Sequence, residues 1–450
     1  MKYFRLPFCS ESVAVGTVLG VALLLMYDYA WASSTSGQAH SDPVASVVLT
    51  IAIILVAAKL AGDVATRIGQ PAVLGELLVG VLLGNLALVG FGGLEYVKSD
   101  STIDMLSRIG VLLLLFEVGL ESTVGQMLKV GWSSLLVAVL GVAAPFALGW
   151  GVGAWLLPTA SVYVHAFLGA TLTATSVGIT ARVLKDIDRS QTAEARVILG
   201  AAVIDDVLGL VILAIVGGVI AAADRGGTIS FGEIALTTGK AAMFLVGSLV
   251  LGMYLSPKLF SLASKLETRG VLLAIGLSFC FFLSWLASIV GLAPIVGAFV
   301  AGLILEDVHY QDFVDRGEHS LEELIHPISA FLVPIFFVLM GMRTDLRSFA
   351  QPSILGLAAA LTVAAIIGKQ LCFFGVIGKG IDRLSVGFGM IPRGEVGLIF
   401  ASIGLSLSVR GEPIVSPATF SAVVVMVIIT TLMTPPMLKW RLSRTISNTQ

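Results

Sequence analysis

Thirteen apolar segments, each long enough to cross a lipid bilayer, follow one another through most of the chain. A membrane-spanning helix needs about 20 mainly apolar residues. Of the 450 residues, 57% are hydrophobic and only 12% are charged, whereas about 25% of a soluble domain is charged. We therefore predict an all-α polytopic membrane protein. The expected segments are residues 43–63, 72–92, 103–121, 131–157, 163–183, 194–222, 232–257, 270–290, 292–307, 323–342, 353–378, 382–408 and 415–438.

The residues ahead of these segments have the pattern of a signal peptide. Lys2 and Arg5 precede an apolar run over 13–26, and the Ala-Trp-Ala at 30–32 has the small-x-small form of a cleavage site. An apolar run of this length is short for a membrane span. We expect a cleavable signal peptide over 1–32, and the alternative is an extra N-terminal helix.

Basic residues are distributed unevenly between the two sides of the expected segments. If the loop after the first segment is cytoplasmic, sixteen lysines and arginines fall on that side and five on the other. Cytoplasmic loops carry the excess of Lys and Arg. The N-terminus of the membrane core is therefore expected outside, and the short tail 439–450 in the cytoplasm. The net charge of −2 gives no indication of a nucleic-acid partner.

Two motifs of the first half recur in the second half at a constant distance of 222 residues. The glycine-containing run 69–80 returns at 291–302, and the run 115–122 returns at 337–344. A constant offset across two motifs in different segments indicates an internal duplication.

This duplication divides the membrane core into two repeats. Segments one to six, over 43–222, pair with segments eight to thirteen, over 270–438, and the segment 232–257 links them. Seven crossings separate equivalent segments, so the two repeats have opposite orientations. Inverted repeats are typical of secondary transporters.

The sixth segment contains two adjacent aspartates, Asp205 and Asp206, in an apolar run. An ionised carboxylate at the centre of a bilayer costs about 2.5–3.5 kcal/mol, so the pair requires a cation, a proton or water. Adjacent helical residues point about 100° apart, so one aspartate can meet a fixed charge while the other faces a water-filled cavity. Lys369, in the middle of the eleventh segment, is the expected fixed charge. The alternative is a lysine that reaches solvent or a backbone carbonyl.

Segments five and twelve, which are equivalent in the repeat, are both predicted to be broken. The hydroxyl-rich run 171–178 and the Pro-Arg-Gly-Glu run 392–395 have low helix propensity. Such breaks are tolerated in a membrane where the backbone lines a cavity. Hydroxyl and carbonyl oxygens suit Na⁺ or Li⁺, and Arg393 and Glu395 are expected to neutralise the half-helix ends. The alternative for the hydroxyl run is close packing between helices.

Taken together, these motifs resemble the monovalent cation:proton antiporter-2 family of bacteria, over roughly residues 44–440. The resemblance is strongest to sodium/proton antiporters with an aspartate pair. It implies a 13-helix antiporter fold with inverted repeats, two crossed discontinuous helices, a panel-like dimerisation domain and a homodimer. It also implies an acid at the second crossing, which falls on Glu395. The runs that carry the resemblance are 115–121, 203–209, 291–302, 334–341 and 393–397.

The resemblance assigns separate roles to the two aspartates. It implies that Asp206 binds the transported ion and carries the proton, whereas Asp205 pairs with Lys369. The hydroxyls at the first crossing fall on Thr175 and Ser176, so Na⁺ is expected at Asp206, Thr175 and Ser176.

The expected function is exchange of Na⁺, or Li⁺, for protons by alternating access, with two protons per Na⁺ and without a cofactor. The sequence contains no HExxH, GxxxxGK[ST] or GxSxG pattern, so a hydrolase or an ATP-driven pump is not expected. The alternatives are a K⁺/proton antiporter, a Na⁺-coupled symporter and, from another class, a cation channel or sensor. A bacterial inner membrane or an internal photosynthetic membrane is the expected location.

Overall fold

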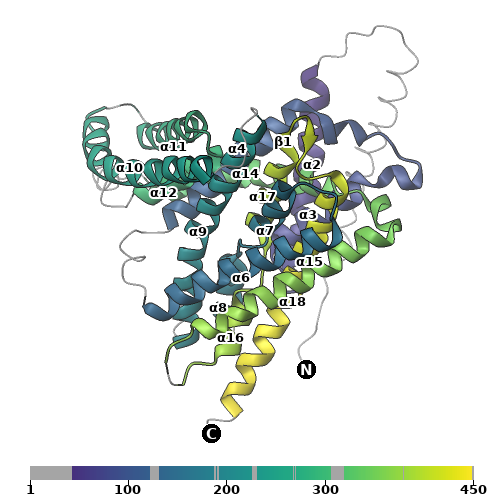
Figure 1. Cartoon of the computed structure of the whole chain (residues 1–450). Helices are drawn as coiled ribbons and strands as arrows, with labels where there is room; N and C mark the ends of the chain where they lie inside the picture. The colour runs from purple at the N-terminus through teal and green to yellow at the C-terminus, as the bar shows by residue number, and fades with distance from the viewer. Residues whose placement is uncertain are drawn as a thin grey trace, which may run out of the picture. The chain divides into compact units, whose positions relative to one another are not determined.

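A computed structural model describes most of the chain beyond the N-terminal 42 residues (Figure 1). The expected signal peptide, 1–32, lies outside the described residues. The chain forms two compact units. Unit 1 contains the described residues up to Arg108 together with Pro334–Asp345, and unit 2 contains Ile109–Val333 and the residues from Leu346 onward. The described ranges are 43–121, 131–186, 189, 192–224, 231–266, 268, 270–305, 319–378 and 380–447.

The described residues are almost entirely helical, as the apolar segments predict. One short antiparallel hairpin pairs β1 (Ser408–Val409) with β2 (Glu412–Pro413). The α-helices are α2 (Pro43–Arg67), α3 (Ala72–Gly84), α4 (Ser101–Glu121), α6 (Trp132–Leu156), α7 (Val162–Thr171), α8 (Val177–Asp186), α9 (Ala193–Asp224), α10 (Phe231–Ala263), α11 (Val271–Val290), α12 (Pro294–Ile304), α14 (Leu321–Met342), α15 (Pro352–Gln370), α16 (Arg383–Gly389), α17 (Gly394–Ser406) and α18 (Pro417–Ser447). The 3₁₀ turns are η1 (Leu86–Val89), η2 (Glu95–Ser99), η4 (Leu346–Ala350) and η5 (Leu371–Gly375).

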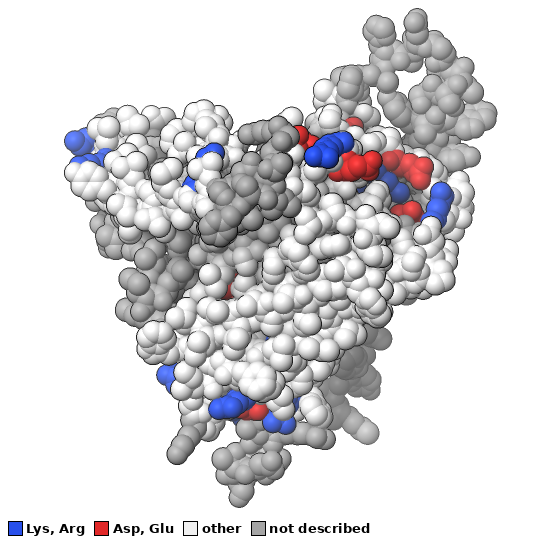
Figure 2. Space-filling model, in the orientation of Figure 1, with Lys and Arg blue, Asp and Glu red and all other residues white. Residues whose placement is uncertain are grey.

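Eight of the described helices are long and apolar enough to cross a membrane, and four shorter apolar helices accompany them. The face drawn in Figure 2 is mostly uncharged, with Lys, Arg, Asp and Glu gathered in small groups. One expected segment, 72–92, is shorter as a helix, because α3 ends at Gly84 and a 3₁₀ turn follows. The linker helix is longer than expected, since α10 continues to Ala263.

In unit 1, two glycines of α3 allow backbones to approach closely. A Cβ atom at Gly75 would overlap the carbonyl oxygen of Ala61 in α2. A Cβ atom at Gly80 would overlap the carbonyl oxygen of Val338 in α14. Small residues let helix backbones pack this closely in membranes. The glycine-containing run of the first repeat is therefore a helix-packing motif.

Unit 2 contains the corresponding contacts at its own glycines. A Cβ atom at Gly297 would overlap the carbonyl oxygen of Leu283, and one at Gly302 would overlap that of Phe116. Each of these four residues lies 222 positions from its counterpart in unit 1. The local packing thus repeats with the sequence, and each unit takes helices from both halves of the chain.

The core of unit 2 is built around α6, which contacts α7, α9 and α15. A buried cluster joins Val137 of α6, Ile198 and Ala201 of α9, Cys372 of η5 and Met390 after α16. Both α9 and α15 contact α6, and the cluster joins α9 to the turn that follows α15. Both helices carry charged residues that the sequence places deep in the membrane.

Near its C-terminal end, α18 is tied by an ion pair to the loop ahead of α16. The Nε and Nη2 atoms of Arg441 donate to the two oxygens of Asp382 at 2.7 and 3.0 Å, and Ser385 Oγ donates to Oδ2 at 2.7 Å. Partial burial raises the pKa of Asp382, but the hydrogen bonds from Arg441 and Ser385 outweigh it. The pKa of this loop carboxyl therefore lies below its ordinary value.

The lowered pKa predicts how stability depends on pH. The ionised Asp382 carboxylate stabilises the folded protein. This stabilisation is fully present above the unfolded-state pKa of about 3.9 and is lost as pH falls through the folded-state value. We expect Asp382→Asn to lower the unfolding temperature at neutral pH, and this difference to shrink as pH falls below about 4. Thermal unfolding in detergent measures this difference in unfolding temperature. Asp63→Asn is the control, because Asp63 shares an exposed ion pair with Arg67 and such pairs contribute about 0–1 kcal/mol. A deficit that persists at the lowest pH would contradict the prediction.

Candidate ion-binding site

Two broken helices lie against each other in unit 2. The first break separates α7 from α8, and the second separates α16 from α17. The backbone N–H of Ser176 donates to the carbonyl oxygen of Pro392 at 2.8 Å. Thr180 Oγ1 donates to the carbonyl oxygen of Gly389, the last residue of α16, at 2.6 Å. The backbone groups freed by one break are thus satisfied in part by the other.

The close approach of the two breaks depends on a glycine. A Cβ atom at Gly394 would lie 2.5 Å from Oγ and 2.6 Å from Cβ of Ser176. The structure therefore brings the hydroxyl run of segment five next to the Pro-Arg-Gly-Glu run of segment twelve. This adjacency matches the two crossed discontinuous helices implied by the resemblance.

Arg393 is fully buried at this crossing. Its Nη1 atom donates to the carbonyl oxygens of Thr173 and Ala174, and its Nη2 atom donates to that of Ala365 in α15 at 3.3 Å. The first two carbonyls lie two and three residues after the end of α7, where the helix dipole places partial negative charge. The guanidinium thus lies at the half-helix end that it is expected to neutralise. Glu395 is in the first turn of α17, and its side chain lies outside the described residues.

The aspartate pair lies in α9, and its two members have different surroundings. Asp205 is fully buried, and Lys369 Nζ donates to its Oδ1 atom at 2.8 Å. Both side chains of this ion pair have an exposed fraction of 0%. Asp206 is only half-buried. The structure thus brings Asp205 and Lys369 together and gives Asp206 the more accessible position.

One turn after the pair, α9 contacts both broken helices. A Cβ atom at Gly209 would lie 3.8 Å from Thr173 Oγ1 in the first break and 3.8 Å from Phe400 in α17. The aspartates therefore lie about one helical turn, or about 5.4 Å of rise, from the residue that contacts the crossing. Helix packing alone places the acids and the hydroxyl run in one region.

Several buried polar atoms at this region have no hydrogen-bond partner among the described residues. They are Thr175 Oγ1, the Oδ2 atom of Asp205 and the Nε atom of Arg393. Buried polar groups are normally paired. A hydroxyl oxygen left unpaired beside a helix break is a suitable ligand for a small cation.

Two residues beside the ion pair are not identified by the sequence reasoning. Gly141 of α6 faces the pair, since a Cβ atom there would lie 3.5 Å from Lys369 Nζ and 3.7 Å from Asp205 Oδ1. Cys372 Sγ donates to the carbonyl oxygen of Lys369. The spacing of Cys372 from Lys369 indicates one helical turn, but nothing in the sequence of α6 distinguishes Gly141 from its other glycines.

Comparison with known proteins identifies a family whose sequence model matches this chain. A model of the transmembrane sodium/hydrogen exchanger family matches residues 51–440. The chain is 39% identical over 430 residues to the high-affinity Na⁺/H⁺ antiporter NhaS3 of Synechocystis sp., covering 88% of this chain and 89% of that protein. It is 34% identical over 395 residues to the Na⁺/H⁺-K⁺ antiporter GerN of Bacillus cereus, covering 87% and 95%.

A further relative and a solved structure are also named as sodium/proton antiporters. The Na⁺/H⁺ antiporter of Enterococcus hirae is 31% identical over 404 residues, covering 88% of this chain and 98% of that protein. The sodium proton antiporter MjNhaP1 of Methanocaldococcus jannaschii superposes with a TM-score of 0.65 at 16% identity, covering 90% of this chain and 98% of that one. The expected antiporter fold is confirmed by this likeness.

Proposed function

This chain belongs to the transmembrane sodium/hydrogen exchanger family, and on that premise we propose that Asp206 is the carboxylate through which it exchanges Na⁺ for protons. The chain is an integral membrane protein and a secondary transporter rather than an enzyme. The expected monovalent cation:proton antiporter resemblance is confirmed at the level of this family. Its relatives NhaS3 and the Enterococcus hirae protein are named as Na⁺/H⁺ antiporters.

The observation that carries this assignment is the difference between the two aspartates. Asp205 is neutralised by Lys369 at 2.8 Å within a fully buried pair. Asp206 is half-buried, and this greater exposure supports it as the member of the pair that binds an entering ion. An ionised carboxylate is costly at the centre of a membrane. Asp206 therefore crosses the barrier with either a proton or a cation, and this alternation couples the two fluxes.

We infer that Thr175 and Ser176 complete the cation site with Asp206. The unpaired, buried Oγ1 atom of Thr175 supports this assignment. Its position beside the break, where helix ends present free backbone groups, supports it further. Hydroxyl and carboxylate oxygens are hard ligands suited to Na⁺ and Li⁺.

We also infer that the exchange is electrogenic. A cation bound at Asp206 lies next in sequence to Asp205 and weakens the attraction between Asp205 and Lys369. Lys369 can then release a proton into the same pathway, so two protons leave as one Na⁺ enters. Net charge crosses the membrane in each cycle.

We also propose how the repeats, the termini and the subunits are arranged in the membrane. Inverted repeats over 43–222 and 270–438, joined by a linker helix over 232–257, are supported by the packing contacts that recur at 222 residues. The excess of basic residues on one side supports an outside core N-terminus and a cytoplasmic tail over 439–450. A homodimer follows from the resemblance, and the signal-like N-terminus fits a bacterial inner membrane or an internal photosynthetic one.

K⁺/proton exchange is the second candidate function. GerN is named as a Na⁺/H⁺-K⁺ antiporter, and a Bacillus subtilis relative that is 26% identical, KhtU, is named as a K⁺/H⁺ antiporter subunit. Oxygen ligands alone do not fix the size of the cation. The greater identity to NhaS3 favours Na⁺.

Dye-monitored proton release from everted vesicles tests the function. We expect Na⁺ and Li⁺ to dissipate a preformed proton gradient, and K⁺ to do so weakly. Proteoliposomes with an imposed membrane potential then test electrogenicity, and the potential is expected to change the rate of Na⁺-driven proton flux. A response to K⁺ alone would replace the first proposal by the second, and no cation response would reject both.

A further inference from the structure

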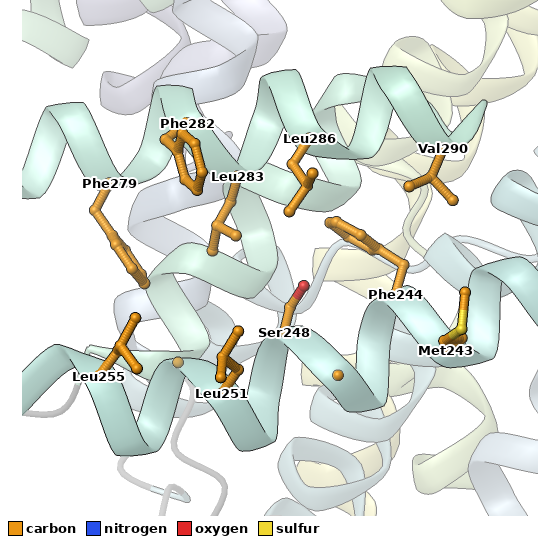
Figure 3. A pocket seen from close by; sticks show the side chains of 12 residues that line it. Met243, Phe244, Ser248, Leu251, Leu255, Phe279, Phe282, Leu283, Leu286 and Val290 are labelled. Carbon is orange, nitrogen blue, oxygen red and sulfur yellow. The ribbon is translucent and has the colours of Figure 1, made fainter.

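An apolar groove of about 290 Å³ lies between α10 and α11 in unit 2. Figure 3 shows side chains of the two helices facing each other across it, with the hydroxyl of Ser248 among them. The other lining side chains are apolar. They include Phe244, Leu251 and Leu255 from α10 and Phe282 and Leu286 from α11.

The groove lies at a surface suited to contact with lipid. Both helices are candidate membrane spans, and only 22% and 28% of their most apolar windows are buried within the protein. Met243 and Leu251 have exposed fractions of 69% and 60%, and Phe282 has 55%. In a membrane protein such apolar side chains are covered by hydrocarbon.

The length of the groove matches one leaflet of a bilayer. Along α10 the lining runs from Met243 to Leu255, which is a rise of about 18 Å. The hydrocarbon core is about 30 Å thick, so one leaflet is about 15 Å deep. The groove is therefore about as long as an acyl chain that crosses one leaflet.

Basic residues are more numerous at one end of this groove than at the other. Lys258 follows Leu255 by three residues on the same helical face, and its Nζ atom lies 3.9 Å from the centroid of the Tyr254 ring. Lys265 is exposed just beyond the end of α10. Lysines near a helix end extend toward the interface and attract anionic lipid headgroups. At the opposite end, Lys240 lies three residues before Met243, and no second lysine accompanies it on α10.

We propose that this groove binds one acyl chain of an anionic phospholipid, with the phosphate held at Lys258. The apolar lining, the length of about one leaflet and the two lysines, Lys258 and Lys265, at one end each fit this ligand. The site is separate from the aspartate pair. The linker helix α10 is then a lipid-binding element.

Native mass spectrometry of the whole protein with added phosphatidylglycerol, or phosphatidylcholine with the same acyl chains, tests the proposal. Lys258→Gln is expected to weaken phosphatidylglycerol binding about fivefold, since a basic residue near the surface contributes about 1 kcal/mol. Phosphatidylcholine binding is expected to stay unchanged. Gly247→Leu is expected to remove one bound lipid of either kind, because a Cβ atom there meets open space in the groove.

Two matched variants of α10 serve as controls. Gly239→Leu also places its side chain in open space, but Gly239 does not line the groove. Lys240→Gln removes a charge at the opposite end. Both are expected to bind lipid as the unaltered protein does, and all four variants are expected to keep Na⁺-driven proton exchange, which shows that they are folded.

Three results would overturn the proposal. The first is unchanged lipid stoichiometry in Gly247→Leu. The second is loss of the phosphatidylglycerol preference in Lys240→Gln but not in Lys258→Gln. The third is a changed oligomeric state in Gly247→Leu without loss of lipid, which would make the groove a contact between copies of the chain.

Discussion

Asp206→Asn is expected to reduce Na⁺-driven proton exchange to the background of vesicles that lack the protein. The amide has nearly the shape of the carboxylate but binds no proton and carries no charge to neutralise a cation. Because the proposed coupling passes through this one group, both fluxes stop together. The measurement is proton release on adding Na⁺ to everted vesicles.

The control for this variant lies in the same helix. Asp224 is exposed at the end of α9, where its Oδ1 atom accepts from the backbone N–H of Arg410. Asp224→Asn removes one carboxylate from α9 without touching the proposed site, so exchange is expected to continue. Full activity of Asp206→Asn would reject the assignment of the carrier, whichever cation the protein prefers.

The second large effect concerns the ion pair between Asp205 and Lys369. Lys369→Met leaves the buried Asp205 carboxylate without its partner, and removal of one member of a buried pair costs about 3–5 kcal/mol. Asp205→Asn is expected to cost a similar amount. The double variant leaves no unpaired charge, so it is expected to recover most of the lost unfolding temperature in detergent.

Transport by the double variant tests the proton stoichiometry separately. If Lys369 supplies the second proton, the double variant exchanges one proton per Na⁺, and its rate no longer responds to an imposed membrane potential. If the potential still changes the rate, the second proton does not come from Lys369. Arg347→Gln, at an exposed position in η4, is the matched loss of one positive charge.

The sequence is informative about this site because the membrane makes certain residues costly. Asp205 and Lys369 stand in apolar runs, where an isolated charge is unfavourable, so a pairing between them is the simplest expectation. The two breaks are predictable for a similar reason, since glycine, proline and hydroxyl residues weaken a helix at a depth where free backbone groups need partners. The structure shows both the pair and the adjacent breaks.

Other features depend on approach between helices, which periodicity and hydropathy do not encode. Gly141 is one of several glycines in α6, and only the fold places it against the ion pair. The early end of α3 at Gly84 is hidden because the residues that follow are still apolar. The bonds from Arg393 to Thr173 and Ala174 depend on the crossing, although a charge at a half-helix end was expected there.

The hydrogen bond between Ser176 and Pro392 has a consequence for expression of the chain in two parts. Its donor belongs to the first half of the sequence and its acceptor to the second, and the same is true of the bond from Thr180 to Gly389. One half of the chain alone would contain one interrupted helix, and the polar groups at its break would lack the hydrogen-bond partners that the other half supplies. Expressed alone, the first half would therefore leave the carbonyl partners of Ser176 and Thr180 missing, so we expect the two halves to need each other to complete this site.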